Sequence, residues 1–106
     1  MTLSNLQQLK YQEHMSRGRD YERNGDNYWN SKDFLTAKSR YMSAASEYKE
    51  AEKIATSGDD YPRQQEAAKA GCNSTAKVHE CPYEYQKLID QQRKSDPYDK
   101  NYSPWR

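Results

Sequence analysis

Apolar and small residues recur three and four positions apart along most of this chain, which is the spacing of one helix face. No proline interrupts the chain from Leu3 to about Trp29, and one stripe in this range collects Tyr11, His14, Gly18, Tyr21, Gly25 and Tyr28. Leu3, Leu6 and Leu9 lie beside the stripe as an apolar cap. The pattern predicts a first helix. A break near Gly18 is the alternative, because glycine costs about 1 kcal/mol relative to alanine inside a helix.

A second helix is predicted after the tight turn at residues 30–33, where Ser31 or Asp33 can cap the free N–H groups. Its expected buried stripe is Phe34, Ala37, Tyr41, Ala44, Tyr48, Ala51 and Ala55. Leu35 and Met42 lie on a second flank, so we expect this helix to pack against two neighbours. It should end at Gly58, with that glycine in the left-handed conformation of a C-terminal cap.

A third helix should begin at Asp59 or Asp60, with Pro62 tolerated in its first turn. Its expected packing face is one of small residues, namely Ala68, Gly71, Cys72, Thr75, Ala76 and His79. Proline at position 82 should end or kink this helix. A short last helix would then run from Pro82 to about Arg93, with Tyr85, Leu88 and Ile89 facing inward.

These elements predict an all-α fold, a three- to four-helix antiparallel bundle. Residues 1–95 would form the helical bundle domain. Residues 96–106 contain two prolines and no periodicity, so we expect an irregular aromatic C-terminal tail.

Composition predicts a thin core. The chain has 106 residues, of which 33% are hydrophobic, and its mean hydropathy is −1.45. Such values are typical of disorder, but the net charge is only +1, and ten Tyr and two Trp supply large surfaces that can be buried. We therefore expect a folded chain whose core a homodimer or a partner could complete.

No group of residues suits catalysis, and we expect no enzyme activity, no cofactor and no metal. His14 and His79 lie on separate predicted helices, as hydrogen-bonded packing residues. Cys72 and Cys81 are nine apart, on opposite sides of a continuous helix, and fit free thiols better than a disulfide. Neither paired metal-ligand spacing nor a glycine-rich phosphate loop is present.

Charge is balanced along the chain, with helical pairs at Glu13/Arg17, Asp20/Arg23, Glu50/Lys53 and Asp90/Lys94. The arginines at 17, 19 and 23 are interrupted by acidic residues, so we expect a solvated face and no nucleic-acid partner. No apolar stretch is long enough to span a membrane. The N-terminus lacks the pattern of a signal peptide, which favours a cytoplasmic setting.

The aromatic residues off the predicted core carry the functional signal, because Tyr and Trp are enriched in protein–protein interfaces. The candidate partner-binding residues are Trp29, Tyr61, Tyr83, Tyr98, Tyr102 and Trp105. Some of them could instead complete the core.

Two trios with matching spacing, Tyr21, Gly25 and Tyr28 and then Ala37, Tyr41 and Ala44, alternate large and small residues on facing helices. This pattern resembles one tetratricopeptide repeat, and nearly as well the hairpin of a microtubule-interacting-and-trafficking domain. Asn24 stands where the repeat has an aliphatic residue, Lys49 stands where it has its closing proline, and no second copy follows. The resemblance implies a helical hairpin with a partner-binding role.

We therefore expect a small non-catalytic protein-binding module. The alternative is a small inhibitor or effector, of the phage, mobile-element or pathogen type, that sterically blocks a larger protein or nucleoprotein machine.

Overall fold

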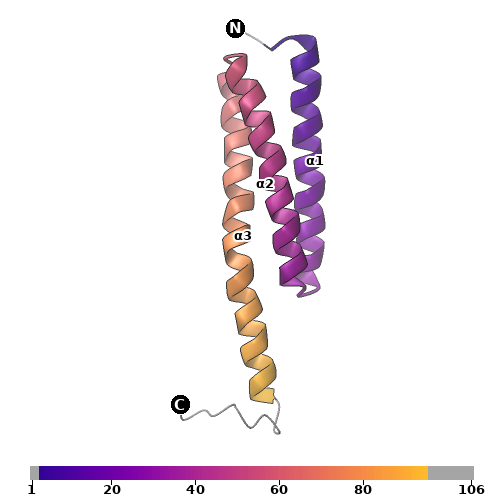
Figure 1. Ribbon diagram of the computed structural model, residues 1–106, viewed down its shortest axis with the longest axis vertical. Helices are drawn as coiled ribbons and strands as arrows, with labels where there is room; N and C mark the ends of the chain where they lie inside the picture. The colour runs from indigo at the N-terminus through magenta and orange to yellow at the C-terminus, as the bar shows by residue number, and fades with distance from the viewer. Residues whose placement is uncertain (1–2, 96–106) are drawn as a thin grey trace.

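The computed structural model describes residues 3–95, with side chains as far as residue 92. Three helices follow one another: α1 (Asn5–Asn30), α2 (Phe34–Ser57) and α3 (Tyr61–Ser95). They run antiparallel, with α2 between the other two and packed against both (Figure 1). The predicted all-α antiparallel fold is confirmed. The predicted tail lies outside the described residues.

Local side-chain chemistry explains where α1 and α2 begin. The Ser4 hydroxyl accepts the N–H of Gln7 at 3.2 Å, while the Gln7 side chain accepts the N–H of Ser4 at 3.0 Å, so both ends of a capping box are present. Asp33 caps α2 by accepting the N–H of Thr36 at 3.3 Å. Between these caps α1 runs without interruption, so the alternative break near Gly18 does not occur.

The end of α2 differs from the prediction. Gly58 has a φ of −98°, and the left-handed residue is Asp59, with a φ of 53°. A Cβ at position 58 would lie 2.2 Å from Cδ2 of Leu3, so a larger residue there would displace the end of the Leu3 side chain. Leu3 is buried at this end, whereas Leu6 and Leu9 are exposed, so only one leucine of the predicted apolar cap packs.

Of the two outcomes predicted at Pro82, an end or a kink, the end does not occur, because α3 continues through Pro82 and no separate fourth helix exists among residues 3–95. Proline inside a helix costs about 3 kcal/mol relative to alanine. Packing on both sides of the exposed Pro82 offsets this cost. Cys81 belongs to a buried cluster with residues of α2, and Val78 and Leu88 pack against that cluster.

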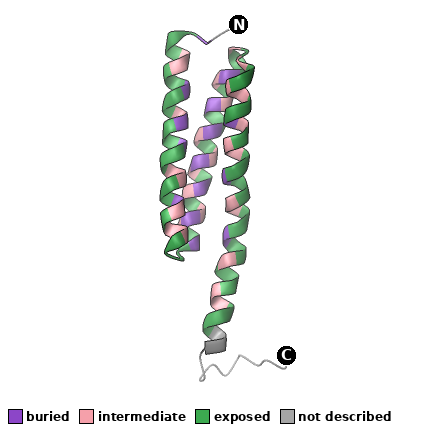
Figure 2. Cartoon of the chain, turned by 180° about the vertical axis from the view of Figure 1, so that it is seen from behind, coloured by how far each residue is buried: buried purple, intermediate pink, exposed green. Residues whose placement is uncertain are grey.

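The buried stripe of α2 is the centre of the core, and every predicted member of it is buried. In α1 the fully buried residues are Tyr11, Met15, Gly18 and Gly25, while His14, Tyr21 and Tyr28 of the predicted stripe are half-buried. Figure 2 shows the buried positions concentrated on α2, and the end of α3 beyond the hairpin largely free of them. Among residues 3–95, no helix is long and apolar enough to cross a membrane.

Two glycines of α1 lie directly against two tyrosines of α2. A Cβ at Gly18 would approach Cε1 of Tyr48 to 2.5 Å, and a Cβ at Gly25 would approach Cε1 of Tyr41 to 2.8 Å. Both pairs have the same seven-residue spacing, in opposite chain directions. The tyrosine rings therefore occupy the space that any other residue on α1 would need, and this sets the antiparallel register.

Alanine substitution at these glycines separates packing from helix propensity. We expect Gly18→Ala and Gly25→Ala each to lower the free energy of unfolding, because overpacking a core costs about 1–3 kcal/mol. At roughly 4–8 °C for each kcal/mol in a domain of this size, thermal melts followed by circular dichroism should resolve the loss.

Gly71→Ala is the matched control. A Cβ at Gly71 would lie 3.6 Å from Cβ of Tyr48, an ordinary contact. This variant should gain up to about 1 kcal/mol from the better helix propensity of alanine. If all three variants are equally stabilised, the tyrosine–glycine contacts do not control the packing.

Candidate functional site

A polar network on one side of the bundle joins all three helices. The hydroxyl of Tyr41 donates to Asp26 at 2.5 Å, and the hydroxyl of Tyr48 donates to Glu22 at 2.8 Å. Lys77 of α3 lies 3.1 Å from Asp26 and 3.9 Å from Glu22. Its ammonium also lies 5.2 Å from the centre of the Tyr41 ring. Each of these two carboxylates of α1 thus accepts a hydrogen bond from one tyrosine of α2 and pairs with Lys77 of α3.

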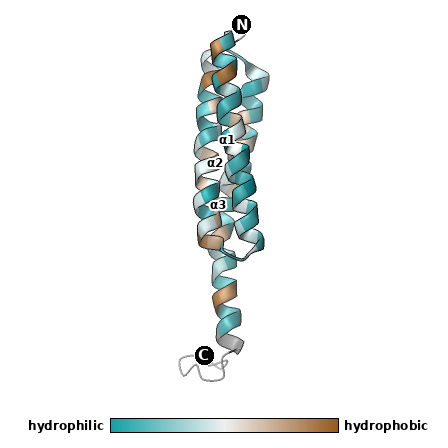
Figure 3. Cartoon of the chain, turned by 90° about the vertical axis from the view of Figure 1, so that its right-hand side faces the viewer, coloured by the Kyte–Doolittle hydropathy of each residue, from teal (hydrophilic) through white to brown (hydrophobic). Residues whose placement is uncertain are grey.

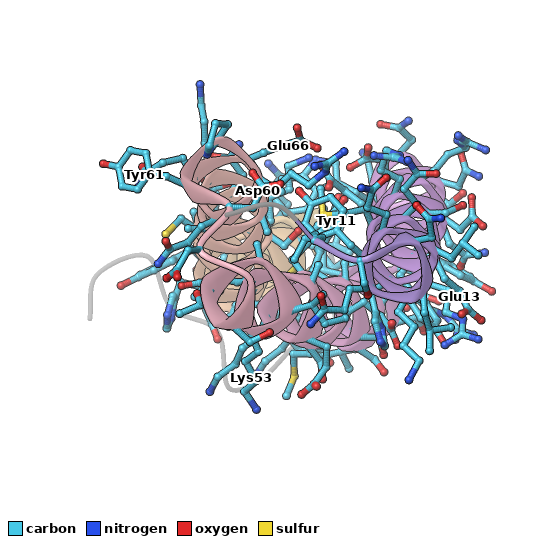
Figure 4. All side chains as sticks on the ribbon, turned by 90° about the horizontal axis from the view of Figure 1, so that it is seen from above. Tyr11, Glu13, Lys53, Asp60, Tyr61 and Glu66 are labelled. Carbon is cyan, nitrogen blue, oxygen red and sulfur yellow. The ribbon has the colours of Figure 1, made fainter. Side chains whose placement is uncertain are left out.

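A second contact between α1 and α3 is made at the other end of the bundle. The Tyr11 hydroxyl donates to the carbonyl oxygen of Arg63 at 3.0 Å, and the Arg63 guanidinium lies 5.8 Å from the Tyr11 ring centre. Figure 4 shows Tyr11 between α1 and the start of α3, with Asp60 and Glu66 nearby. Burial, together with the charge of Glu66, raises the pKa of Tyr11 to about 12.

Sequence analysis missed both of these arrangements. It assigned the tyrosine hydroxyls no particular partner and read most of the charges as a solvated face. The available signal was the placement of acidic residues next to the glycine stripe of α1, at Glu22 and Asp26. A carboxylate at either position can accept a hydrogen bond from the hydroxyl of a tyrosine whose ring packs against a glycine of α1.

The histidine and cysteine predictions have different outcomes. His14 is a hydrogen-bonded packing residue as predicted, with Nδ1 2.8 Å from Glu47 Oε2. His79 is exposed, so its predicted place in the core is wrong. Both cysteines are free thiols, Cys72 exposed and Cys81 buried, and burial raises the pKa of Cys81. No group of three potential metal-ligating side chains occurs within the described part of the chain.

Ion pairs within α1 and α2 match the predicted helical pairs. Arg17 pairs with Glu13, and Arg23 lies 3.9 Å from Asp20. On α2, Lys53 lies 3.2 Å from Glu50. These three predicted pairs are confirmed. The fourth involves Lys94, whose side chain lies outside the described part.

The predicted partner-binding residues divide into three groups. Trp29 is half-buried, and its ring packs edge-on against Phe34 with the ring centres 5.1 Å apart, so it closes one end of the core. Tyr61 and Tyr83 are exposed, at 67% and 73%. Figure 4 shows Tyr61 pointing away from the hairpin. The remaining three, Tyr98, Tyr102 and Trp105, lie outside the described residues.

The face of α3 that was predicted to pack inward lies at the surface instead. Cys72, Thr75, Ala76 and His79 are exposed, and the buried residues of α3 are Ala67, Ser74 and Cys81. The prediction failed because small residues occur all round this helix, so their spacing alone does not distinguish the packed face from the free one. Leu35 and Met42 of α2 are also exposed, at 56% and 55%, although α2 does pack against two neighbours.

Apart from Leu35, these exposed residues line a groove between α2 and α3, which we call the α2–α3 groove. It encloses about 720 Å³. Its α2 wall is Met42, Ala45, Ser46, Lys49 and Glu52, and its α3 wall is Ala68, Gly71, Cys72, Thr75, Ala76, Val78 and His79. Most of this lining is small or apolar. The groove offers a shallow apolar surface with few charges, and Tyr61 and Tyr83 lie on α3 beyond its two ends.

No family model, curated protein or solved structure matches this chain. The residues and their geometry are therefore the whole basis for inferring a function.

Removing Lys77 should destabilise the bundle, because it would leave Asp26 and Glu22 without their shared cation. We expect Lys77→Met to cost about 1 kcal/mol, the upper end for an ion pair that is partly open to solvent. Urea denaturation would measure it. Lys69→Met, at an exposed position of the same helix, is the control and should change stability by less than about 0.5 kcal/mol. Equal effects of the two substitutions would show that the network contributes nothing.

The tyrosine hydroxyls predict a specific alkaline transition. Burial and the hydrogen bonds to Asp26 and Glu22 also raise the pKa values of Tyr41 and Tyr48. Above the ordinary tyrosine pKa of about 10 the unfolded chain loses these protons while the folded chain keeps them. The stability contributed by Tyr11 is therefore complete below pH 10 and is lost as the pH rises through its folded-state pKa of about 12.

Urea midpoints measured at rising pH would test this. The slope of stability against pH in the alkaline range should be smaller in a variant carrying Tyr11→Phe, Tyr41→Phe and Tyr48→Phe than in the unmodified chain. An unchanged slope would rule out these three hydroxyls as its cause.

Proposed function

We propose that this chain is a small non-catalytic protein-binding module that acts through the α2–α3 groove. The observation that carries the proposal is the exposure of apolar and aromatic side chains along this face, in a chain that is otherwise strongly polar. Met42 lines the groove and is 55% exposed. Leu35 lies seven residues earlier on the same side of α2, and Tyr61 and Tyr83 lie on α3 beyond the ends of the groove. All three are more than half exposed. Exposed aromatic and methionine side chains around a shallow apolar floor are typical of protein–protein contact surfaces.

The arrangement of the helices supports the same proposal. The α1–α2 hairpin carries the large and small alternation on which the resemblance to a tetratricopeptide repeat rests. With α3 antiparallel on α2, the order of the helices is that of a repeat followed by the first helix of the next unit, but the hairpin, which spans Asn5 to Ser57, is longer than the repeat's usual length of about 34 residues. We propose a tetratricopeptide-like module that uses its outer helix face for binding.

The other polar features fit a structural role. The carboxylates of Asp26 and Glu22 are engaged by Tyr41, Tyr48 and Lys77 in holding the helices together. Protein binding needs no further chemistry than the apolar face supplies.

Affinity capture with the purified chain as bait would test the proposal. Proteins recovered from an extract of the source organism would be identified by mass spectrometry, and the best candidate would be purified and titrated. We expect Met42→Glu to weaken that binding at least about tenfold, the effect of losing about 1.4 kcal/mol at an interface hot spot. The substitution should leave the fold intact, because Met42 is exposed.

Leu9→Glu is the matched control. Leu9 is 66% exposed, but it lies on α1, away from the groove. Binding that falls equally in both variants would place the contact elsewhere. Failure to recover any protein whose titration responds to Met42→Glu would overturn the proposal.

A further inference from the structure

One line of side chains along α3 has nearly the same order from either end. It consists of Tyr61, Gln65, Ala68, Cys72, Ala76, His79 and Tyr83, and we call it the α3 stripe. The successive spacings are four, three, four, four, three and four residues, so they are symmetric about Cys72. The residue types are symmetric as well. Tyrosines stand at both ends, alanines flank the central cysteine, and Gln65 corresponds to His79.

The α3 stripe lies on the exposed side of α3, and four of its members, Ala68, Cys72, Ala76 and His79, also belong to the α3 wall of the α2–α3 groove. All its members are exposed except Ala68, which is half-buried. The residues that α3 buries in the bundle, Ala67, Ser74 and Cys81, lie on a different side of the helix. None of the seven residues is Asp, Glu, Lys or Arg. On a chain in which 31% of residues are charged, this uncharged exposed line is available for contact.

We propose that the α3 stripe binds a second copy of this chain, with the two α3 helices antiparallel about a two-fold axis at Cys72. Each residue would then face the one equally far on the other side of Cys72. Tyr61 of one copy meets Tyr83 of the other, and Ala68 meets Ala76. A two-fold interface uses the same patch on both subunits, which therefore has to be complementary to itself. The symmetric order of the α3 stripe meets this requirement, and a different partner would have no need of it.

The chemistry of the stripe suits close helix packing. Alanine and cysteine at the centre let the helix axes approach to about 8 Å, the short end of the usual range. The tyrosines at the ends bury their rings and keep their hydroxyls at the rim, near water. The charges that flank the stripe do not oppose each other either. By the same pairing Lys69 faces Thr75, and Glu80 faces Gln64.

This inference rests on the proposed function, because it names a second copy as one occupant of the same face. A two-fold axis perpendicular to the pair of α3 helices carries α2 to the same side in both copies. The two α2 walls, each with Met42, would then face the same way beside the α3 pair. They are left for the contact with another protein.

Light scattering on the full chain tests the dimer. We expect a mass of twice 12.5 kDa for the unmodified chain. Ala76→Glu should shift the mass to that of the monomer, because the carboxylate would be buried opposite Ala68 of the other copy. Asn73→Glu is the control, since Asn73 is exposed on α3 outside the stripe, and it should remain dimeric. Circular dichroism and thermal melts would show that both variants are folded.

Crosslinking then tests the position of the axis. A short bismaleimide should join two chains through Cys72, because the two Cys72 thiols face each other at the axis. Cys81 is buried and should not react. Cys72→Ser should abolish the crosslinked product and leave the mass in solution dimeric.

The outcomes separate the two proposals. A monomeric unmodified chain, or a dimer that Ala76→Glu leaves intact, would overturn the α3 pairing. Neither result would affect protein binding that depends on Met42. A dimer that responds to Ala76→Glu but whose Cys72 thiols do not crosslink would overturn the placement of the axis. A correct dimer with no Met42-dependent partner would support the pairing and remove the proposed function.

Discussion

The contact of two tyrosine rings with two glycines is the constraint on which the rest of this structure depends. Tyr48 and Tyr41 of α2 lie where α1 has Gly18 and Gly25, and no other residue type would leave them room. Because the rings pass so close to the α1 backbone, their hydroxyls reach Glu22 and Asp26. The carboxylates in turn engage Lys77 of α3. A single packing choice thus sets the register of the hairpin and provides the charges that hold α3.

This construction explains how so polar a chain can have a core. The buried residues are mostly alanines and tyrosines, with very few aliphatic side chains among the described residues. Tyrosine supplies a large apolar ring, and its hydroxyl is satisfied by a carboxylate near the surface. The core is thin, so the part of α3 that lies beside α2 has a packed side and a free side. Figure 3 shows α3 continuing past the hairpin with a hydrophobic segment on it.

The free side of α3 is where the proposals meet. The residues of the α3 stripe are mostly small or aromatic and carry no formal charge. The outer face of α1, by contrast, carries ion pairs such as Glu13 with Arg17. An exposed surface without charge has no advantage in water unless it contacts another molecule. Symmetric pairing of the α3 stripe and binding of another protein along α2 use adjacent parts of the same face. In this arrangement one helix both forms the assembly and positions its binding surface.

The sequence alone determined the first two helices, the hairpin that they form and the complete buried stripe of α2. It did so because Phe, Tyr and Ala alternate there against strongly polar neighbours, so only one face can be apolar. It also placed Tyr61 and Tyr83 off the core. Only the tertiary structure decided which side of α3 is buried, because small residues occur on all sides of that helix and its contacts with α2 determine which of them are buried. The same holds for the continuation of α3 through Pro82, which depends on contacts that Val78, Cys81 and Leu88 make with another helix. The spacing of apolar residues identifies the buried face of a helix only where its apolar and polar faces differ clearly. The buried side of α3 and its path through Pro82 depend instead on the side chains of the neighbouring helix.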